Sequence, residues 1–253
     1  MTPAPDPTLH HPRILCLHGG GTNARIFRAQ CRGHSSHLCR YFRLVFAEAP
    51  FPSTAGPDVL PVYEAYGPFK SWLRGKHPDQ PEPDPTSTWE AVDVALAQAV
   101  FDDDAKGATG PWVAVFSQGA KMAASVLLRA QEAPSTLRRI WKEGDVKLRF
   151  GVVMVGRPPL MPIDERGVRD GDDEAGNAGM LLYLPTVHVL GLRDGGLSSH
   201  RKLLEWCERG SATVVEWDGE HRVPIRTGDL QLVVDAILAV AAETKGFGFL
   251  RVT

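Results

Sequence analysis

The chain has 253 residues, a formal net charge of −2 at pH 7, 43% hydrophobic residues and 23% charged residues, all typical of a globular protein with a sizeable core. This balance of charge argues against nucleic-acid binding through a basic face and against an anionic membrane partner. No apolar run approaches the roughly 18 residues that span a bilayer, and the proline-rich residues 1–12 predict a disordered lead-in rather than a secretory signal.

Short apolar segments that alternate with helical patterns predict a doubly wound, mostly parallel sheet of about six strands with helices on both faces. Near-continuous apolarity is typical of strands that are covered on both faces. The expected strands are Arg13–His18, Arg43–Ala47, Trp112–Phe116, Phe150–Val155, Thr186–Gly191 and Thr213–Trp217. The expected helices are Thr88–Asp102, Gln118–Ala130, Ser198–Arg209 and Asp229–Glu243. Ser87 and Glu90 form a plausible capping box for the first of these helices.

We expect a single domain over residues 13–245, followed by a tail at 246–253, because no linker or internal repeat divides the chain. Two irregular insertions interrupt the alternation, near residues 50–85 and 156–184. Long insertions of this kind tend to be functional lids or disordered loops. Both follow the carboxyl ends of expected strands, where ligands bind to open parallel sheets.

The four cysteines, Cys16, Cys31, Cys39 and Cys207, show no spacing typical of a metal site. We therefore interpret them as reduced thiols, which are typical of the cytoplasm. The sequence predicts a cytoplasmic protein that binds no metal.

Ser117 lies in the context that a nucleophile elbow requires. It follows the expected strand Trp112–Phe116 and precedes Gln118-Gly119-Ala120, which opens a helical pattern of small residues. A tight turn between strand and helix lifts a serine hydroxyl above the edge of a sheet. Val115 replaces the first glycine of the usual G-x-S-x-G pattern, so local packing must accommodate its side chain. A helix-capping serine is the simpler alternative.

A serine nucleophile needs a base, and the base needs a carboxylate that fixes its tautomer. Asp194 comes just after an expected strand, and His221 follows the next one. The order Ser…Asp…His along the chain is the order found in α/β-hydrolases. A turn aspartate before two glycines remains the alternative for Asp194. Asp218 and Glu220 are too close in sequence to His221 to reach its ring easily.

The run Leu17-His18-Gly19-Gly20-Gly21 lies where an α/β-hydrolase forms its oxyanion hole. The run lacks the lysine and the glycine spacing of phosphate-binding loops. We expect the N–H of Gly20 or Gly21, together with that of Gln118, to bind the oxyanion. Each such donor contributes about 3–4 kcal/mol to stabilising a transition state.

These motifs, taken together, resemble the fungal serine hydrolases of the FSH family. The segments that carry the resemblance are Arg13–Gly19 with Asn23, Phe46–Pro50, Tyr66–Leu73, Phe116–Ala120, Gly191–Asp194 and Gly219–Pro224. The resemblance runs from about Arg13 to Asp235. It implies an α/β-hydrolase fold with Ser117 as nucleophile, Asp194 as orienting acid and His221 as base. It is greatest to members encoded beside fungal polyketide synthases, which release a polyketide from an acyl carrier protein as thioesterases.

The sequence therefore predicts a serine hydrolase that releases an acyl chain from a carrier-bound thioester through an acyl-enzyme on Ser117, without a cofactor. A carboxylesterase that acts on small free esters is the alternative in the same chemistry. A non-catalytic binding protein of the same fold is the alternative from a different class, with Val115 as its only support.

Two further sets of residues are candidates for contact with the substrate or a partner. The candidates for the acyl pocket are Phe27, Phe116, Pro159, Leu160 and Met161, with plain packing as the open alternative. A basic cluster could bind an acidic carrier domain, or could be a solvated charged face. Its members are Arg138, Arg139, Lys142, Lys147 and Arg149.

Overall fold

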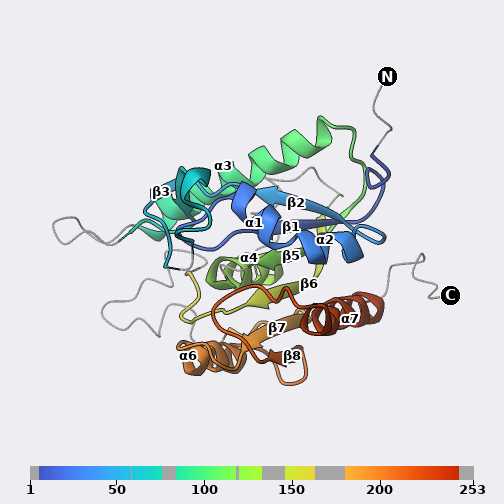
Figure 1. Ribbon diagram of the computed structural model, residues 1–253. Coiled ribbons are helices and arrows are strands. Elements are labelled where there is room, and N and C mark those ends of the chain that lie inside the picture. Colours follow the sequence, from blue (N-terminus) through green and yellow to red (C-terminus); the bar gives the residue numbers. More distant parts are fainter. Residues whose placement is uncertain are drawn as a thin grey trace.

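The apolar segments predicted as strands form one six-stranded sheet in the order β2-β1-β5-β6-β7-β8, in which every pairing is parallel (Figure 1). The computed structural model describes residues 6–57, 59–75, 84–117, 120–132, 146–162 and 180–244. The strands are β1 (Arg13–Leu17), β2 (Arg43–Ala47), β5 (Trp112–Ser117), β6 (Val146–Met154), β7 (Thr186–Gly191) and β8 (Ala212–Trp217). The sheet confirms the predicted α/β class.

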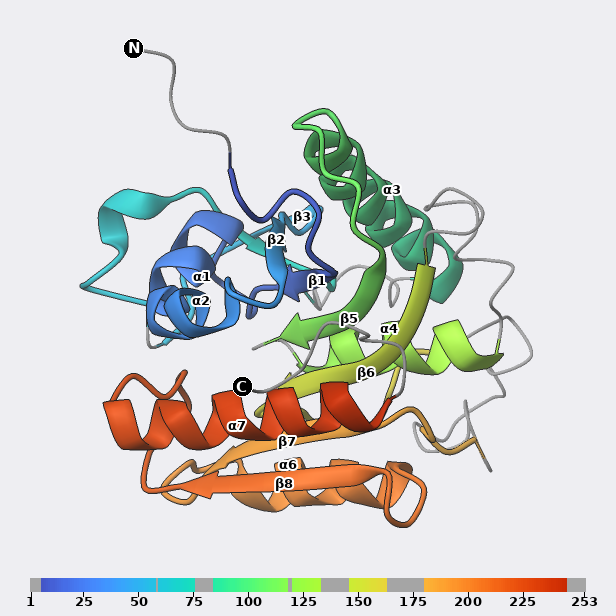
Figure 2. The same ribbon diagram turned by 90° about the vertical axis from the view of Figure 1, so that its right-hand side faces the viewer.

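Helices cover both faces of this sheet. One layer contains α1 (Ala24–Gln30), α2 (Arg32–Leu38) and α7 (Thr227–Glu243), and the other contains α3 (Pro85–Asp104), α4 (Ala120–Glu132) and α6 (Leu197–Lys202). Figure 2 shows α7 in front of the sheet and α4 and α6 behind it. Successive residues of a strand point to opposite faces, so Ile14 and Cys16 pack in the first layer while Leu15 and Leu17 pack in the second.

The insertion predicted as irregular near residues 50–85 contains regular structure. Strands β3 (Phe51–Ser53) and β4 (Phe69–Ser71) pair antiparallel, and a 3-10 turn, η1 (Glu64–Tyr66), lies between them. The strands are too short to show a period in a proline-rich segment, which is why the sequence pattern missed them. Most of the second insertion, residues 163–179, lies outside the described residues.

The prediction of a disordered lead-in at residues 1–12 is wrong for the part that the structure describes. The carboxylate of Asp6 accepts a hydrogen bond of 2.6 Å from Arg43 at the start of β2, and Arg43 also donates to Thr8 Oγ1. The bonds from Arg43 and Thr8 lower the pKa of Asp6 to about 2. These polar contacts hold residues 6–12 against the sheet although the segment lacks an apolar pattern.

Helix α3 begins earlier than predicted, and its cap is a different residue. The carboxylate of Asp84 accepts the backbone N–H groups of Thr86 and Ser87, at 3.2 and 2.9 Å. Pro85 occupies the first helical position, where its fixed φ favours a helix start. Ser87 is thus inside the first turn, and the capping box with Glu90 is wrong. The helix predicted to reach Arg209 is also shorter: α6 ends at Lys202, and a 3-10 turn, η3 (Leu203–Trp206), follows.

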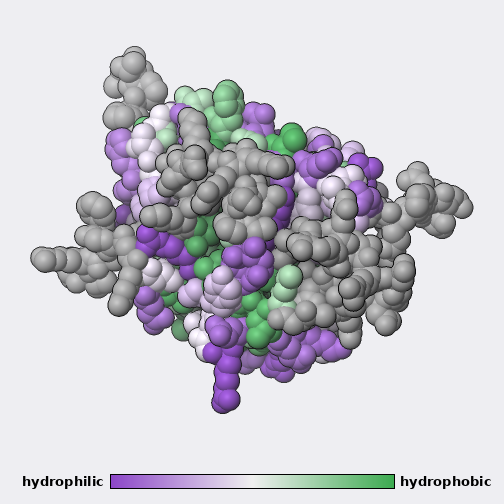
Figure 3. Space-filling model, turned by 180° about the vertical axis from the view of Figure 1, so that it is seen from behind, coloured by the Kyte–Doolittle hydropathy of each residue, from purple (hydrophilic) through white to green (hydrophobic). Residues whose placement is uncertain are grey.

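On the face shown in Figure 3, the residues coloured by hydropathy are mostly hydrophilic, with hydrophobic residues in patches. Over the described ranges, no helix has both the length and the apolar character needed to cross a membrane. The four cysteines are free thiols, and all except Cys39 are buried. Burial in the apolar layers raises the pKa of the Cys207 thiol to about 11, so it is a poor nucleophile at neutral pH.

Replacement of Asp84 by alanine is expected to lower the free energy of unfolding by about 1 kcal/mol, because two N–H groups of the first turn lose their acceptor. Ser87→Ala is the matched control. It removes only an exposed hydroxyl bond to the Asp84 carbonyl, so its effect should be within about 0.5 kcal/mol. Urea unfolding of both variants measures the difference. A larger loss in Ser87→Ala than in Asp84→Ala would contradict this assignment of the cap.

His34 of α2 is fully buried, and its two ring nitrogens have no hydrogen-bond partner within the described chain. Burial, with a smaller effect of His37, lowers the pKa of His34 to about 4. An unfolded chain binds this proton already below about pH 6.5. Stability should therefore fall as the pH drops from about 6.5 to about 4.

The variant His34→Leu is expected to remove this contribution, so that at pH 4.5 it is more stable relative to wild type than at pH 7.5, by on the order of 2 kcal/mol. Chemical unfolding at both pH values measures it. Ser36→Ala, at an exposed position of the same helix, should keep the wild-type slope. An unchanged slope in His34→Leu would refute the assignment.

Candidate active site

The carboxyl ends of β5, β7 and β8 bring Ser117, Asp194 and His221 to one edge of the sheet. Ser117 is the last residue of β5, Asp194 lies in the turn after β7, and His221 lies in the loop after β8. Strands β7 and β8 are neighbours, and β6 alone separates β5 from β7. Since neighbouring strands lie roughly 5 Å apart, the sheet order brings the three residues to the same edge, with Asp194 and His221 after adjacent strands and Ser117 two strands away from Asp194.

The connection around Ser117 shows how the sheet accommodates Val115. Val115 is fully buried and pairs with Gly151 of β6, while Ser117, also buried, pairs with Val153. A Cβ atom on Gly151 would lie 2.2 Å from Leu127 Cδ1 of α4. Gly151 of β6 therefore permits the close approach of α4 on the face of the sheet where Val115 packs. Gln118, one of the predicted oxyanion donors, lies outside the described residues.

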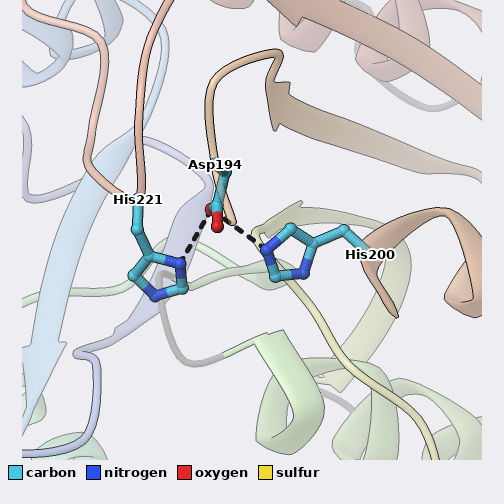
Figure 4. A group of neighbouring side chains, drawn as sticks. All are labelled: Asp194, His200 and His221. Atoms are coloured by element: carbon cyan, nitrogen blue, oxygen red, sulfur yellow. Dashed lines mark hydrogen bonds and ion pairs between the residues drawn. The ribbon is translucent and has the colours of Figure 1, made fainter. Parts of the chain in front are cut away.

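Asp194 is the most highly coordinated group at this edge (Figure 4). Its Oδ2 atom lies 2.8 Å from Nδ1 of His221 and 3.0 Å from Nε2 of His200, and its Oδ1 atom accepts the N–H of Gly196 at 2.7 Å. Its side chain is only 2% exposed. Burial acts to raise the pKa of Asp194, but the hydrogen bonds from Gly196 and His221, together with the charges of His221 and His200, outweigh it, and the pKa is lowered. The carboxylate is therefore ionised at neutral pH.

His221 combines a buried contact with an open side. Its Nδ1 atom faces Asp194, the other ring nitrogen points away from that carboxylate, and the side chain is 39% exposed. The two acidic residues nearest in sequence are engaged elsewhere. Asp218 pairs with Arg193 at 2.9 Å, and Glu220 pairs with Arg222 at 2.6 Å. Asp194 is thus the carboxylate bonded to the His221 ring, and the Gly196 bond shows that it also caps its own turn.

Gly20 and Gly21, in the glycine run after β1, have different roles. The Gly21 N–H donates to the carbonyl of Lys70 at 2.9 Å, and the Gly21 carbonyl accepts from Gly56, so this N–H is not available to an oxyanion. Gly20 is exposed, and no partner of its N–H is found in the described part of the chain. Of the two glycines predicted as alternative oxyanion donors, Gly20 is the one whose N–H remains a candidate. The His18 ring also contacts the glycine run: its Nδ1 atom lies 2.8 Å from the carbonyl oxygen of Gly19.

Four of the five predicted pocket residues pack in the core. Phe27 and Phe116 are buried with their rings stacked, centroids 5.7 Å apart. Leu160 and Met161 are buried in the opposite layer, and Pro159 is half-buried. Plain packing, the alternative to a pocket, therefore describes all of them except Pro159. An apolar residue looks the same in sequence whether it lines a pocket or fills a core.

Most of the predicted basic cluster lies outside the described residues, namely Arg138, Arg139, Lys142 and the side chain of Lys147. Arg149 is described, and its guanidinium donates to the carbonyl of Thr244 at the end of α7, at 3.3 Å. This contact ties β6 to α7, which is a structural role.

The sequence reasoning missed His200, which lies on α6 with no exposed surface. The ligand atoms of His200, Asp194 and His221 all lie within 4.8 Å of one another, a spacing that a transition metal could bridge. The hydrogen bonds to the shared carboxylate already account for that spacing. The signal available in the sequence was a histidine on the first turn of the helix that follows the acid.

Comparison with known proteins shows the family and the fold of the chain. Residues 8–232 match the sequence model of a family described as Serine hydrolase (FSH1). Esterase pigG of Monascus ruber is 50% identical over 258 residues, which cover 94% of each chain. Probable esterase azaC of Aspergillus niger is 49% identical, over 94% of this chain and 88% of its own. The crystal structure of esterase PE8 has the same fold, with a TM-score of 0.55 over 94% of this chain and 96% of its own, at 14% identity.

The two glycines should respond differently to substitution. Gly21 has a φ of +72°, and a Cβ there would lie 2.3 Å from the backbone nitrogen of Gly56, so Gly21→Ala should lose about 2–4 kcal/mol of stability. A Cβ on Gly20 would meet only Ser71 Oγ, at 3.8 Å, so Gly20→Ala should lose less than about 1 kcal/mol. Thermal and urea unfolding compare them. Equal losses would contradict the structural role given to Gly21.

Proposed function

Because this chain belongs to the FSH1 family and is a serine hydrolase, we propose that it hydrolyses acyl esters or thioesters through a covalent intermediate on Ser117. One observation carries the proposal. The buried carboxylate of Asp194 is bonded to Nδ1 of His221 at the sheet edge where β5 ends in Ser117. An ionised acid, a half-exposed imidazole and a serine at a strand end are the parts that acyl transfer to water requires.

In the proposed reaction, Asp194 accepts the Nδ1–H of His221 and so leaves Nε2 unprotonated as the base. His221 takes the Ser117 proton, and Ser117 Oγ attacks the acyl carbonyl. The tetrahedral oxyanion accepts hydrogen bonds from the N–H groups of Gly20 and Gln118. The alcohol or thiol leaves with the proton from His221. A water molecule, deprotonated by His221, then frees the acid and restores Ser117.

For the substrate, we propose an acyl thioester carried on the pantetheine arm of an acyl carrier protein, such as that of a polyketide synthase. A carrier-bound substrate has to enter from outside with its arm extended, and the exposure of Gly20 and of the His221 ring supports such access. The resemblance to the offloading thioesterases supports the same choice. The four free cysteines support a cytoplasmic location.

A free oxygen ester is the second candidate substrate, and a specific observation favours it. The relatives at 50% and 49% identity are described as an esterase and a probable esterase. The only member of the basic cluster whose side chain is described, Arg149, bonds to the protein itself, so the described residues supply no separate support for a carrier-binding face.

Replacement of Ser117 by alanine should reduce kcat at least about 10³-fold, because the nucleophile is lost while binding and oxyanion contacts remain. A fluorophosphonate should label wild type on Ser117 and leave the variant unlabelled, as read by mass spectrometry. Ser125→Ala, at an equally buried serine on α4, is the control and should keep both turnover and labelling. Turnover that survives in Ser117→Ala would refute the mechanism.

The substrate class is decided by matched substrates. Acyl-pantetheine thioesters, the same acyl groups loaded on a carrier protein, and the corresponding ethyl esters are compared by kcat/KM. A preference of 10²-fold or more for the carrier-loaded form supports the carrier proposal. Equal or faster hydrolysis of the ethyl esters would establish the free-ester candidate in its place.

A further inference from the structure

Both ring nitrogens of His200 face oxygen atoms that only accept hydrogen bonds. Nε2 lies 3.0 Å from Asp194 Oδ2, and Nδ1 lies 2.9 Å from the carbonyl oxygen of Gly156. A neutral imidazole carries a single N–H, so one of its nitrogens would direct a lone pair at an oxygen lone pair. Only an imidazolium donates both bonds. A proton on Asp194 could remove the conflict, but Asp194 also accepts hydrogen bonds from Gly196 and His221, which lower its pKa and favour its ionised form without any charge on His200.

The charged groups around His200 favour the same protonation state. Asp194, in direct contact and 2% exposed at its side chain, supplies the counter-charge that a buried cation needs. Arg157, after β6, opposes it, because its guanidinium and His200 Nε2 both approach Gly196. Arg157 is exposed to solvent and screened, whereas the two acceptors of His200 are direct contacts. On its own helix the neighbouring Arg201 pairs with Glu216 of β8 at 2.8 Å.

The backbone at the end of β6 presents one of the two acceptors. Val155, the residue before Gly156, has a φ of 52°, which is uncommon for a β-branched residue. The Val155 N–H still bonds to Val189 of β7 at 3.3 Å, so the chain leaves the sheet at this point with the Gly156 carbonyl directed at the ring. A costly conformation beside a functional site is typical of a geometry that the surroundings hold in place.

We propose that His200 is a positively charged positioning residue that lowers the proton affinity of His221 through the carboxylate that the two histidines share. This inference rests on the proposed roles of Asp194 and His221. The two rings lie 5.7 Å apart between centroids, so a charge on His200 opposes a second charge on His221. The same charge offsets part of the Asp194 field at His221. His221 then remains a free base at lower pH than it would beside an unshared carboxylate.

The variant His200→Gln tests this, because glutamine keeps a hydrogen-bond donor but carries no charge. The acidic limb of the pH profile of kcat/KM should move to higher pH by about one unit, from a charge roughly 6 Å away in a partly solvated site. A merely structural role would lower kcat and leave the limb in place. His188→Gln is the control, since His188 is also buried but contacts Thr186 and Cys207; its limb should not move.

Direct observation keeps the test decisive if His200→Gln does not fold. In ¹⁵N-labelled wild type, side-chain correlation spectra should show both ring nitrogens of His200 protonated from pH 6 to pH 8. A spectrum with an unprotonated His200 nitrogen in this range would overturn the inference. Spectra of His188→Gln and His34→Leu, with other single histidine variants, assign the signals.

Failure of the inference and failure of the proposed function give different results. If fluorophosphonate labels Ser117 and the limb of His200→Gln stays at the wild-type pH, only the role of His200 is wrong. If Ser117 is not labelled and Ser117→Ala retains turnover, the proposed function is wrong, and the protonation state in the spectra still decides whether His200 is charged.

Discussion

A carboxylate without exposed oxygens is stable as an anion only when hydrogen-bond donors surround it, and this constraint organises the candidate site. Asp194 receives one donor from the backbone of its own turn at Gly196, one from His200 on α6, and one from His221 after β8. The parallel sheet makes this convergence possible, because the carboxyl ends of neighbouring strands meet at one edge. Moving any of these three segments would leave the buried charge short of a donor, so the edge is fixed as a unit.

The same sheet order places the parts that have to reach Ser117. Leu17 at the end of β1 pairs with Ser117 at the end of β5, and the three glycines follow Leu17 after His18. The proposed oxyanion donor Gly20 is therefore on one side of Ser117, and the acid and base are on the other, beyond β6. Gly21 fixes the first side by bonding to Lys70 of β4. The short β3–β4 pair, which supplies none of the proposed catalytic groups, thus holds the glycine loop in position.

Sequence patterns predicted the elements that have a regular apolar pattern along the chain. They missed features that depend on contacts between residues distant in sequence. Near-continuous apolarity located all six strands, most of them to within one residue, whereas α1 and α2 have seven residues each and show no helical period. Ser117, Asp194 and His221 could be predicted as a triad because their order along the chain is itself a signal. His200 was missed because a histidine near a helix start reads as a surface residue until the carboxylate beside it is known. Phe27 was assigned to a pocket because burial in a core leaves no separate mark in sequence.

A carboxylate bonded to two histidines separates two tasks that a simple acid–base pair performs together. The Gly196 bond to Oδ1 fixes the rotation of the Asp194 carboxylate, and the His221 bond to Oδ2 fixes the tautomer of the base. In an isolated pair, the same negative charge that fixes the tautomer also strengthens the base and keeps it protonated up to a higher pH. With His200 charged, as we propose, orientation is retained while part of that field is offset. The base is then free over a wider acidic range but drives proton transfer less strongly. This compromise between orientation and base strength depends on the Gly156 carbonyl, because that acceptor is what requires the second proton on His200.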